Sequence, residues 1–251
     1  IRDWDRSRGL GDVYKRQIIP VSILLNFVIK GYSIINFIEI FQITLSSISL
    51  AFISSSFIML LSLLMIIVGA YKSNNFQKIL IFFASSGYAF PGTILAVGIV
   101  VFVGWLNDLI YFRMSYAVGG FIILLFAYSI RFLAVGNGAI TSGISRIHPN
   151  LLDASRTMGV SFFKSIRKII LPLLYTNLLV GGILVFVDIL KELPITLLLR
   201  PFNFETLATY VYQYASDEML EESAFAALII VIAGLGPVIF LNRTITKSIK
   251  N

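Results

Sequence analysis

Cysteine is absent from this sequence, and histidine occurs once, as His148. Without cysteine the chain has no disulfide, no thiolate nucleophile and no cysteine-ligated metal. A single histidine argues against a histidine-based metal site or catalytic triad. We therefore expect no metal site and no cofactor bound by this chain itself.

Charged residues are also scarce, at 13% of the 251 residues, whereas hydrophobic residues reach 57% and the mean hydropathy is +0.89. Soluble domains are about 45–50% apolar, so too little polar surface remains here to cover a water-soluble globule. The composition predicts an all-α, polytopic membrane helix bundle. The net charge of +7 fits basic cytoplasmic loops in contact with anionic membrane lipid, and it does not indicate a nucleic-acid partner.

Residues 1–17 differ from everything that follows, because they are polar and contain no apolar run. A cleaved signal peptide would have an apolar core. The ending DVYKRQ resembles translated adapter sequence. We interpret residues 1–17 as an artefact or a disordered tail, and residues 18–251 as one membrane domain.

Five apolar stretches reach the roughly twenty residues that a membrane span needs. They cover residues 43–70, 79–105, 116–136, 173–190 and 223–241. Residues 18–29 are too few, and we interpret them as the surviving end of a first span. We expect no charge near the middle of a full span, which argues against a secondary transporter or channel. The spans also lack the His, Cys or paired carboxylates of a membrane-embedded enzyme.

Two residues interrupt these spans. Pro91 removes a backbone donor and should kink the helix over 79–105, either as a structural kink or as one beside a transport pathway. Arg131 lies in the last third of 116–136, and we expect its side chain to snorkel to the cytoplasmic interface.

Basic residues set the orientation, since Lys and Arg concentrate in cytoplasmic loops. The loop over 145–172 carries five of them, namely Arg146, Arg156, Lys164, Arg167 and Lys168. This loop and the C-terminus are therefore predicted to be cytoplasmic, and the acidic 191–222 segment is predicted to be external.

The 145–172 loop has the signals of two short helices. Pro149 suits a first helical position, Gly159 suits the left-handed residue that ends a helix, and Ser161 suits the N-cap of a second helix. Pro172 should turn Leu171 out of α geometry and bend the chain into the next span.

The first of these helices carries Asp153 near its start, where the helix dipole favours a carboxylate. Ala154 and Ser155 are small and would allow close approach to another surface. The helix could therefore project into a partner's groove, or the helix pair could lie on anionic lipid.

The same loop resembles the signature of ABC-importer permeases, which reads Glu-Ala-Ala, three residues, Gly, nine residues, Ile, any residue, Leu-Pro. The matching or conservatively replaced positions are Asp153, Ala154, Ser155, Gly159, Ile169, Leu171 and Pro172. The resemblance implies a type I permease fold in the bacterial cytoplasmic (inner) membrane, with a loop that couples transport to an ATPase.

Partners follow from this resemblance: a cytoplasmic ABC ATPase dimer, a second permease half and a periplasmic or lipid-anchored substrate-binding protein. The chain has no Gly-rich phosphate-binding loop ending in Gly-Lys-Ser/Thr, so it is expected to be non-catalytic, with ATP used by the partner. A single signature loop suggests the C-terminal half of a fused tandem permease. A half-size permease that pairs with its own copy is the alternative.

Signals for the substrate lie outside the loop. Residues 90–95 are similar to the Pro-Gly span of these permeases, and residues 128–135, 188–196 and 206–209 resemble the iron(III) branch. They favour iron(III) over polyamine, thiamine or sulfate.

A charged group follows the 173–190 span. Asp188 stands three residues before Lys191 and four before Glu192, which are helix-neighbour spacings. These side chains could form a gate or the contact with the binding protein. Alternatively, they form a boundary cluster that anchors the helix in the membrane.

Overall fold

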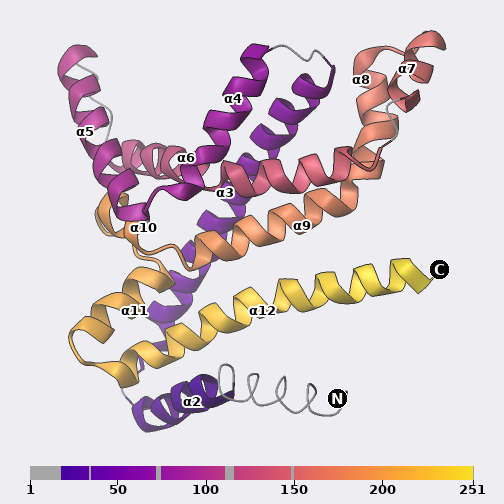
Figure 1. Ribbon diagram of the computed structural model, residues 1–251. Coiled ribbons are helices and arrows are strands. Elements are labelled where there is room, and N and C mark those ends of the chain that lie inside the picture. Colours follow the sequence, from indigo (N-terminus) through magenta and orange to yellow (C-terminus); the bar gives the residue numbers. More distant parts are fainter. Residues whose placement is uncertain (1–17, 34, 72–74, 111–115, 148–149, 251) are drawn as a thin grey trace, which may run out of the picture.

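The computed structural model describes residues 18–33, 35–71, 75–110, 116–147 and 150–250, and every regular element within them is helical (Figure 1). In chain order the elements are α2 (Ile19–Gly31), α3 (Phe37–Tyr71), α4 (Asn75–Ser86), the 3-10 turn η2 (Gly87–Ala89), α5 (Gly92–Ile110), α6 (Tyr116–Ile144), α7 (Asn150–Thr157), α8 (Phe162–Ser165), the π-helical turn η3 (Ile166–Ile170), α9 (Leu171–Leu190), α10 (Pro194–Leu199), α11 (Leu207–Ser216) and α12 (Leu220–Lys250). The predicted all-α fold is confirmed. The predicted tail over 1–17 and the predicted first helical residue Pro149 lie outside the described residues.

Three long helices, α3, α6 and α9, pack on one another and form the main core. Each contributes fully buried side chains, including Ile58, Tyr128 and Val185. Close contact between membrane helices needs small residues, and Gly181 in α9 supplies one. A Cβ at that position would stand 2.7 Å from the Cβ of Ala139 in α6.

A second, smaller core joins the two ends of the described chain. Figure 1 shows the long helix α12 beside α2 and α11, and the three helices meet around buried Ile40, Leu207, Tyr210 and Ala226. The 191–222 segment is therefore not an extended connector. It folds into α10 and α11, which supply buried side chains to the two cores.

Four stretches of the described residues are long and apolar enough to cross a membrane, namely Phe37–Gly69, Gly120–Ile144, Phe162–Leu190 and Leu220–Ile239. The bent pair Ile79–Ala89 and Gly92–Asn107 is a fifth candidate. Each predicted full span therefore has a helical counterpart, and α2, with 13 residues, is short as expected. The counterparts extend beyond the predicted limits, most of all where the first starts at Phe37, where α6 continues to Ile144 and where the stretch ending in α9 starts at Phe162.

The helix bends at Pro91, as predicted, and the bend is larger than a kink. The two helical arms on either side of this proline are bent by 117°, so residues 79–107 form either a broken span or a re-entrant loop. The physical reason lies one residue earlier. A proline disfavours α geometry in the preceding residue, and Phe90 is extended, with ψ 136°. The helix therefore ends at η2 and a new one, α5, begins after the proline (Figure 1).

At Pro172 the sequence predicts a bend, whereas the structure shows a continuous helix. Leu171 is α-helical, with φ −59° and ψ −45°, so the predicted bend is wrong. The π-helical turn η3 ends directly before Leu171 and leads into α9 without a break. Because hydrogen bonds in a π turn skip one additional residue, the turn accommodates a proline that would otherwise interrupt the helix.

Gly87 allows the 3-10 turn η2 to lie against the backbone of α6. A Cβ at Gly87 would come within 1.9 Å of the Ile130 carbonyl oxygen, which cannot rotate away as a flexible side chain would. We expect Gly87→Ala to lower the free energy of unfolding by about 3 kcal/mol, as overpacking does. The control is Gly98→Ala in α5, where a Cβ meets nothing within 4 Å. Thermal unfolding in detergent measures both, and equal midpoints would contradict the proposed contact.

Candidate functional site

The 145–172 loop presents α7, which ends in a tight left-handed turn. Gly159 has φ +71°, which confirms the prediction for this residue. The Val160 N–H donates to the Ser155 carbonyl at 3.0 Å, and the Met158 N–H donates to the Ala154 carbonyl at 3.1 Å. The first of these bonds spans the left-handed residue and closes the helix as a Schellman motif does. The chain then reverses toward α8.

Ser161 starts the second helix of the loop from an extended conformation, with φ −65° and ψ 152°. The predicted N-cap position is therefore confirmed, although the serine side chain makes no cap hydrogen bond there. The cap bond that does form uses the backbone, since the Ser165 N–H donates to the Ser161 carbonyl at 3.0 Å.

Ser155 faces the interior of the loop. Its hydroxyl lies 2.9 Å from the hydroxyl of Ser165 in α8, and both side chains are fully buried. Ala154 and Met158 lie on the exposed side, and the Met158 residue is 72% exposed. The small residue at 155 thus braces α7 on α8, and among the described side chains of α7 those on the face with Ala154 are free to meet another surface.

The remaining signature positions lie where the loop enters the membrane domain. Ile169 and Leu171 are half-buried and Pro172 is exposed, next to buried Ile170, which belongs to the main core. The side chain of Asp153 lies outside the described part of the structure. The second helix therefore ties the exposed helix α7 to the core of the bundle.

Replacing Ser155 by leucine should separate α7 from α8, because the larger side chain has no room at a fully buried position. Ala154→Leu is the matched control, since Ala154 is exposed. We expect faster proteolysis of the loop in Ser155→Leu and wild-type proteolysis in Ala154→Leu. Equal cleavage of the two variants would contradict the buried serine contact.

Arg131 lies between helices, and its side chain is 20% exposed. Its Nε is 3.4 Å from Glu192 Oε2, and its Nη1 donates to the Phe90 carbonyl oxygen at 2.9 Å. The predicted snorkelling is wrong because α6 continues to Ile144, thirteen residues beyond Arg131 and roughly 20 Å along the helix. The expectation that no span has a charge near its middle is wrong for the same reason.

Further groups surround the guanidinium. It lies 5.9 Å from the centroid of the Tyr88 ring and 5.8 Å from that of Phe132, within range of cation–π attraction. Among the described residues Arg131 Nε makes no hydrogen bond, so its contact with Glu192 is an ion pair held by charge. Burial raises the pKa of the Glu192 carboxyl, and the positive charge of Arg131 opposes that rise.

Asp188, Lys191 and Glu192, which were predicted to act together, form two separate ion pairs in the structure. Lys191 Nζ pairs with Asp188 Oδ1 at 2.8 Å, and Lys191 is 62% exposed. Glu192 is only 7% exposed and turns inward to Arg131. Sequence reasoning identified Glu192 but not its partner, 61 positions earlier. The available signal was an arginine inside a long apolar run.

Short hydrogen bonds fix α10 next to this ion pair. The Thr196 hydroxyl donates to the Glu192 carbonyl at 2.7 Å and lies 2.5 Å from the Tyr128 hydroxyl in α6. The Ile195 N–H donates to Glu192 Oε1 at 3.4 Å. In the parts of the chain that the structure describes, no three His, Asp or Glu side chains gather as metal ligands. The arrangement joins α6, α9 and α10.

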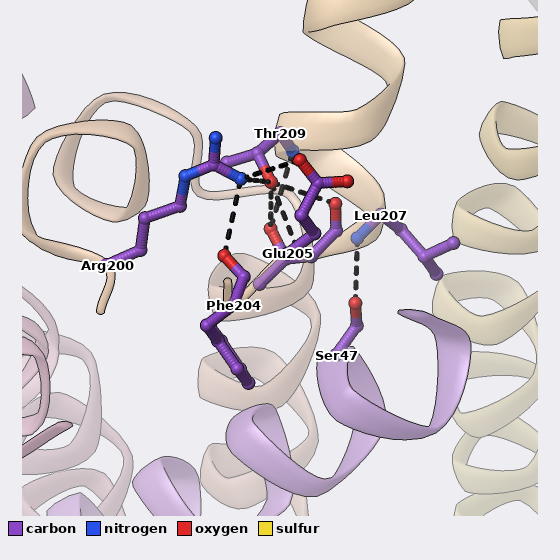
Figure 2. A network of polar contacts seen from close by, with 7 residues as sticks. Ser47, Arg200, Phe204, Glu205, Leu207 and Thr209 are labelled. Carbon is purple, nitrogen blue, oxygen red and sulfur yellow. Dashed lines mark hydrogen bonds and ion pairs between the residues drawn. The ribbon is translucent and has the colours of Figure 1, made fainter. Parts of the chain in front are cut away.

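A polar network organises the turn between α10 and α11, and the sequence analysis did not anticipate it (Figure 2). Arg200 Nη1 donates to the Phe204 carbonyl, to Glu205 Oε1 at 3.1 Å and to the Thr209 hydroxyl at 3.3 Å. Thr206 and Thr209 form a capping box at the start of α11. The 206–209 motif therefore has a structural role in starting this helix.

The same network connects the turn to α3. The Leu207 N–H donates to the Ser47 hydroxyl at 2.7 Å, as Figure 2 shows. At the tip of the turn Asn203 adopts φ 58°, a conformation that asparagine tolerates, and Phe202 is 96% exposed. The turn between α10 and α11 is thus held in place from its base.

Comparisons with known proteins agree on one family. Residues 63–251 match the family model described as binding-protein-dependent transport system inner membrane component. The Fe(3+)-transport system permease protein FbpB 2 of Haemophilus influenzae is 24% identical over 230 residues, which cover 90% of this chain and 44% of that protein. The chain thus spans less than half the length of this curated relative.

Two solved structures share the fold. An inward-facing form of the MetNI methionine ABC transporter superposes with a TM-score of 0.59 at 15% identity, covering 83% of this chain and 95% of that chain. A bacterial ABC transporter involved in the import of the acidic polysaccharide alginate superposes with a TM-score of 0.56 at 16% identity, covering 94% and 97%. At these identities the likeness concerns the fold.

Proposed function

Because this chain belongs to the family of binding-protein-dependent transport system inner membrane components, as a polytopic permease subunit of an ABC importer, we propose that it transports iron(III). The support is the iron(III) permease that aligns with 90% of the chain. Polyamine, thiamine and sulfate are the alternative substrates. Since the described residues contain no cluster of metal ligands, iron would pass this subunit without a resident site.

We further propose that the 145–172 loop couples transport to ATP hydrolysis by a separate cytoplasmic ATPase dimer. The observation that carries this proposal is the braced helix α7, which ends at left-handed Gly159 and is held on α8 through the Ser155–Ser165 contact. A rigid helix tied to the bundle core transmits a displacement, whereas a loose loop absorbs it. Ala154 and the rest of the exposed face would dock on the ATPase, and Asp153 is a further candidate from the signature sequence.

The remaining partners follow from the same proposal. A second permease half, fused to this one or an identical copy, would complete the pathway, and the C-terminus of α12 would lie in the cytoplasm. A periplasmic or lipid-anchored binding protein would deliver the substrate to the outer side. There the pair of half-buried Asp188 and exposed Lys191 is a candidate contact and buried Glu192 a candidate gate. ATP would be bound and hydrolysed by the partner alone.

Ala154→Leu tests the docking, because it enlarges the exposed face of α7 without disturbing the buried serine contact. We expect the wild-type chain, coexpressed with its second half, to copurify with the ATPase, and Ala154→Leu to lose the ATPase while keeping its thermal stability. Retention of the ATPase by the variant at wild-type yield would overturn the docking surface.

Uptake of radiolabelled iron(III) into proteoliposomes that contain the whole transporter and its binding protein tests the substrate. We expect accumulation that requires ATP and is unaffected by excess thiamine, sulfate or polyamine. Accumulation of one of those three compounds in place of iron would overturn the assignment to iron(III).

A further inference from the structure

Two helix breaks, far apart in the sequence, meet at one arginine. The first separates η2 from α5 at extended Phe90, and the second separates α9 from α10 at residues 191–193. Arg131 of the unbroken helix α6 donates to the Phe90 carbonyl at the first break and pairs with Glu192 at the second. We call this group of two breaks and one arginine the joint.

The two breaks approach each other closely because Gly92 has no side chain. A Cβ at Gly92 would lie 2.8 Å from Glu192 Oε1, 3.2 Å from Arg131 Nη1 and 3.3 Å from the Cβ of Pro194. The start of α5 therefore rests directly on the start of α10. The Phe90 carbonyl, which a continuing helix would have paired, is available to Arg131 because the helix stops there.

Stability alone is a poor explanation for this charged contact. A buried ion pair must recover the cost of removing both charges from water, and apolar side chains of similar volume often replace such pairs without loss. The joint also relies on one side chain for its contacts with both breaks, namely Arg131. A contact between two side chains can be broken and replaced in one step, whereas the set of hydrogen bonds along a helix cannot.

We propose that Arg131 is a positioning residue of the transport cycle, whose ion pair with Glu192 holds the two breaks together in the conformer described here and parts when the pathway changes its side of access. This inference rests on the proposed transport function. Alternating access needs two arrangements of the helices, and helix breaks are where spans bend most easily. At the joint, the two helix breaks can move apart from each other.

The chain contains no cysteine, so paired cysteines can be introduced without first removing native ones. Gly92→Cys with Pro194→Cys places two Cβ atoms about as far apart as a disulfide requires. In the assembled transporter we expect oxidation of this pair to reduce substrate uptake roughly tenfold or more below that of the reduced variant, because one arrangement is locked. We expect reduction to return uptake to the reduced variant's own level, which lies below wild type because a side chain at position 92 crowds Glu192 Oε1.

Gly31→Cys with Glu221→Cys is the matched control. A Cβ at Gly31 would lie 2.9 Å from both the Cβ and the carbonyl oxygen of Glu221, so α2 and α12 must move slightly apart to accept this pair, which lies away from the joint. We expect its oxidation to leave uptake at the level of the same variant when reduced. Wild-type uptake by a fully cross-linked 92–194 protein would overturn the inference. Failure of the wild-type chain to retain an ATPase or to transport would instead overturn the proposed function.

A second measurement covers the case in which the double cysteine variant does not assemble. Glu192→Gln keeps the shape of the side chain and removes its charge, so it should weaken the joint. We expect ATP hydrolysis per assembled complex, measured without binding protein, to rise about threefold to tenfold as the locked conformer loses population. Arg131→Lys, which keeps the charge, should stay closer to wild type than Arg131→Gln. Unchanged hydrolysis in both Glu192→Gln and Arg131→Gln would overturn the inference, since a merely structural contact alters yield and not this rate.

Discussion

Replacing Arg131 by methionine should lower the free energy of unfolding by about 3–5 kcal/mol, the usual cost of leaving one member of a buried ion pair alone. Glu192 is 7% exposed and would keep its negative charge without a nearby cation, and the Phe90 carbonyl would lose its donor. Thermal unfolding of the detergent-solubilised protein measures the loss.

The loss should depend on pH. Burial already raises the pKa of Glu192, and removal of Arg131 takes away the largest opposing effect, so the pKa of the folded state rises further. A carboxyl whose folded-state pKa exceeds its unfolded value contributes stability below the unfolded pKa and loses it as the pH rises through the folded pKa. Arg131→Met should therefore be closest to wild type near pH 5 and furthest from it near pH 8, since unperturbed Glu titrates at about 4.3.

A double variant and a surface variant are the controls. Arg131→Met combined with Glu192→Met removes both charges and should recover most of the lost stability. Lys191→Met breaks the exposed pair with Asp188, and we expect it to cost less than about 1 kcal/mol. If Arg131→Met unfolds at the wild-type temperature at both pH values, the buried ion pair does not form in solution.

Local chemistry explains which features of the loop the sequence predicted correctly. Gly159 and Ser161 have roles that depend on residues a few positions away, because a left-handed residue and an extended N-cap are set by backbone sterics and nearby hydrogen bonds. The helical spans were predictable for a similar reason, since a long apolar run is itself the signal.

Contacts between distant segments were not predictable in this way. Nothing near Arg131 in the sequence indicates Glu192, and nothing near Ser47 indicates the Leu207 N–H. Both contacts depend on how the helices pack. The snorkelling prediction failed because it used the apparent end of an apolar run, which Asn137 and Ser142 interrupt before the helix itself ends.

The two prolines show how one local rule gives two outcomes. At Pro91 the preceding residue becomes extended and the helix breaks, whereas at Pro172 a π turn absorbs the missing donor and the helix continues. Proline opposes regular helix geometry at both sites, and the packing around each site determines whether the helix breaks or continues. Arg131 and Glu192 stabilise the break at Pro91, and no such ion pair is described at Pro172 within residues 150–250.

Replacing Gly159 by proline should abolish coupling between the ATPase and transport. Gly159 has φ +71°, whereas the proline ring fixes φ near −65°. The chain after α7 would leave in another direction, so Ser155 could no longer reach Ser165. We expect uptake and ATPase retention to fall roughly tenfold or more, because a helix that is not braced on the core cannot pass on the partner's motion.

Gly159→Asn is the matched control, because asparagine tolerates left-handed geometry and the position has open space around it, with nothing within 4 Å of an added Cβ. We expect this variant to retain the ATPase and to transport at close to the wild-type rate. Since residue 159 is exposed and is not part of the main core, we expect neither substitution to change the thermal stability of the bundle. Transport by Gly159→Pro at the wild-type rate would show that the loop does not need its turn. Equal loss in both variants would point to a contact of the glycine itself, so the difference between asparagine and proline isolates the backbone geometry as the property that coupling requires.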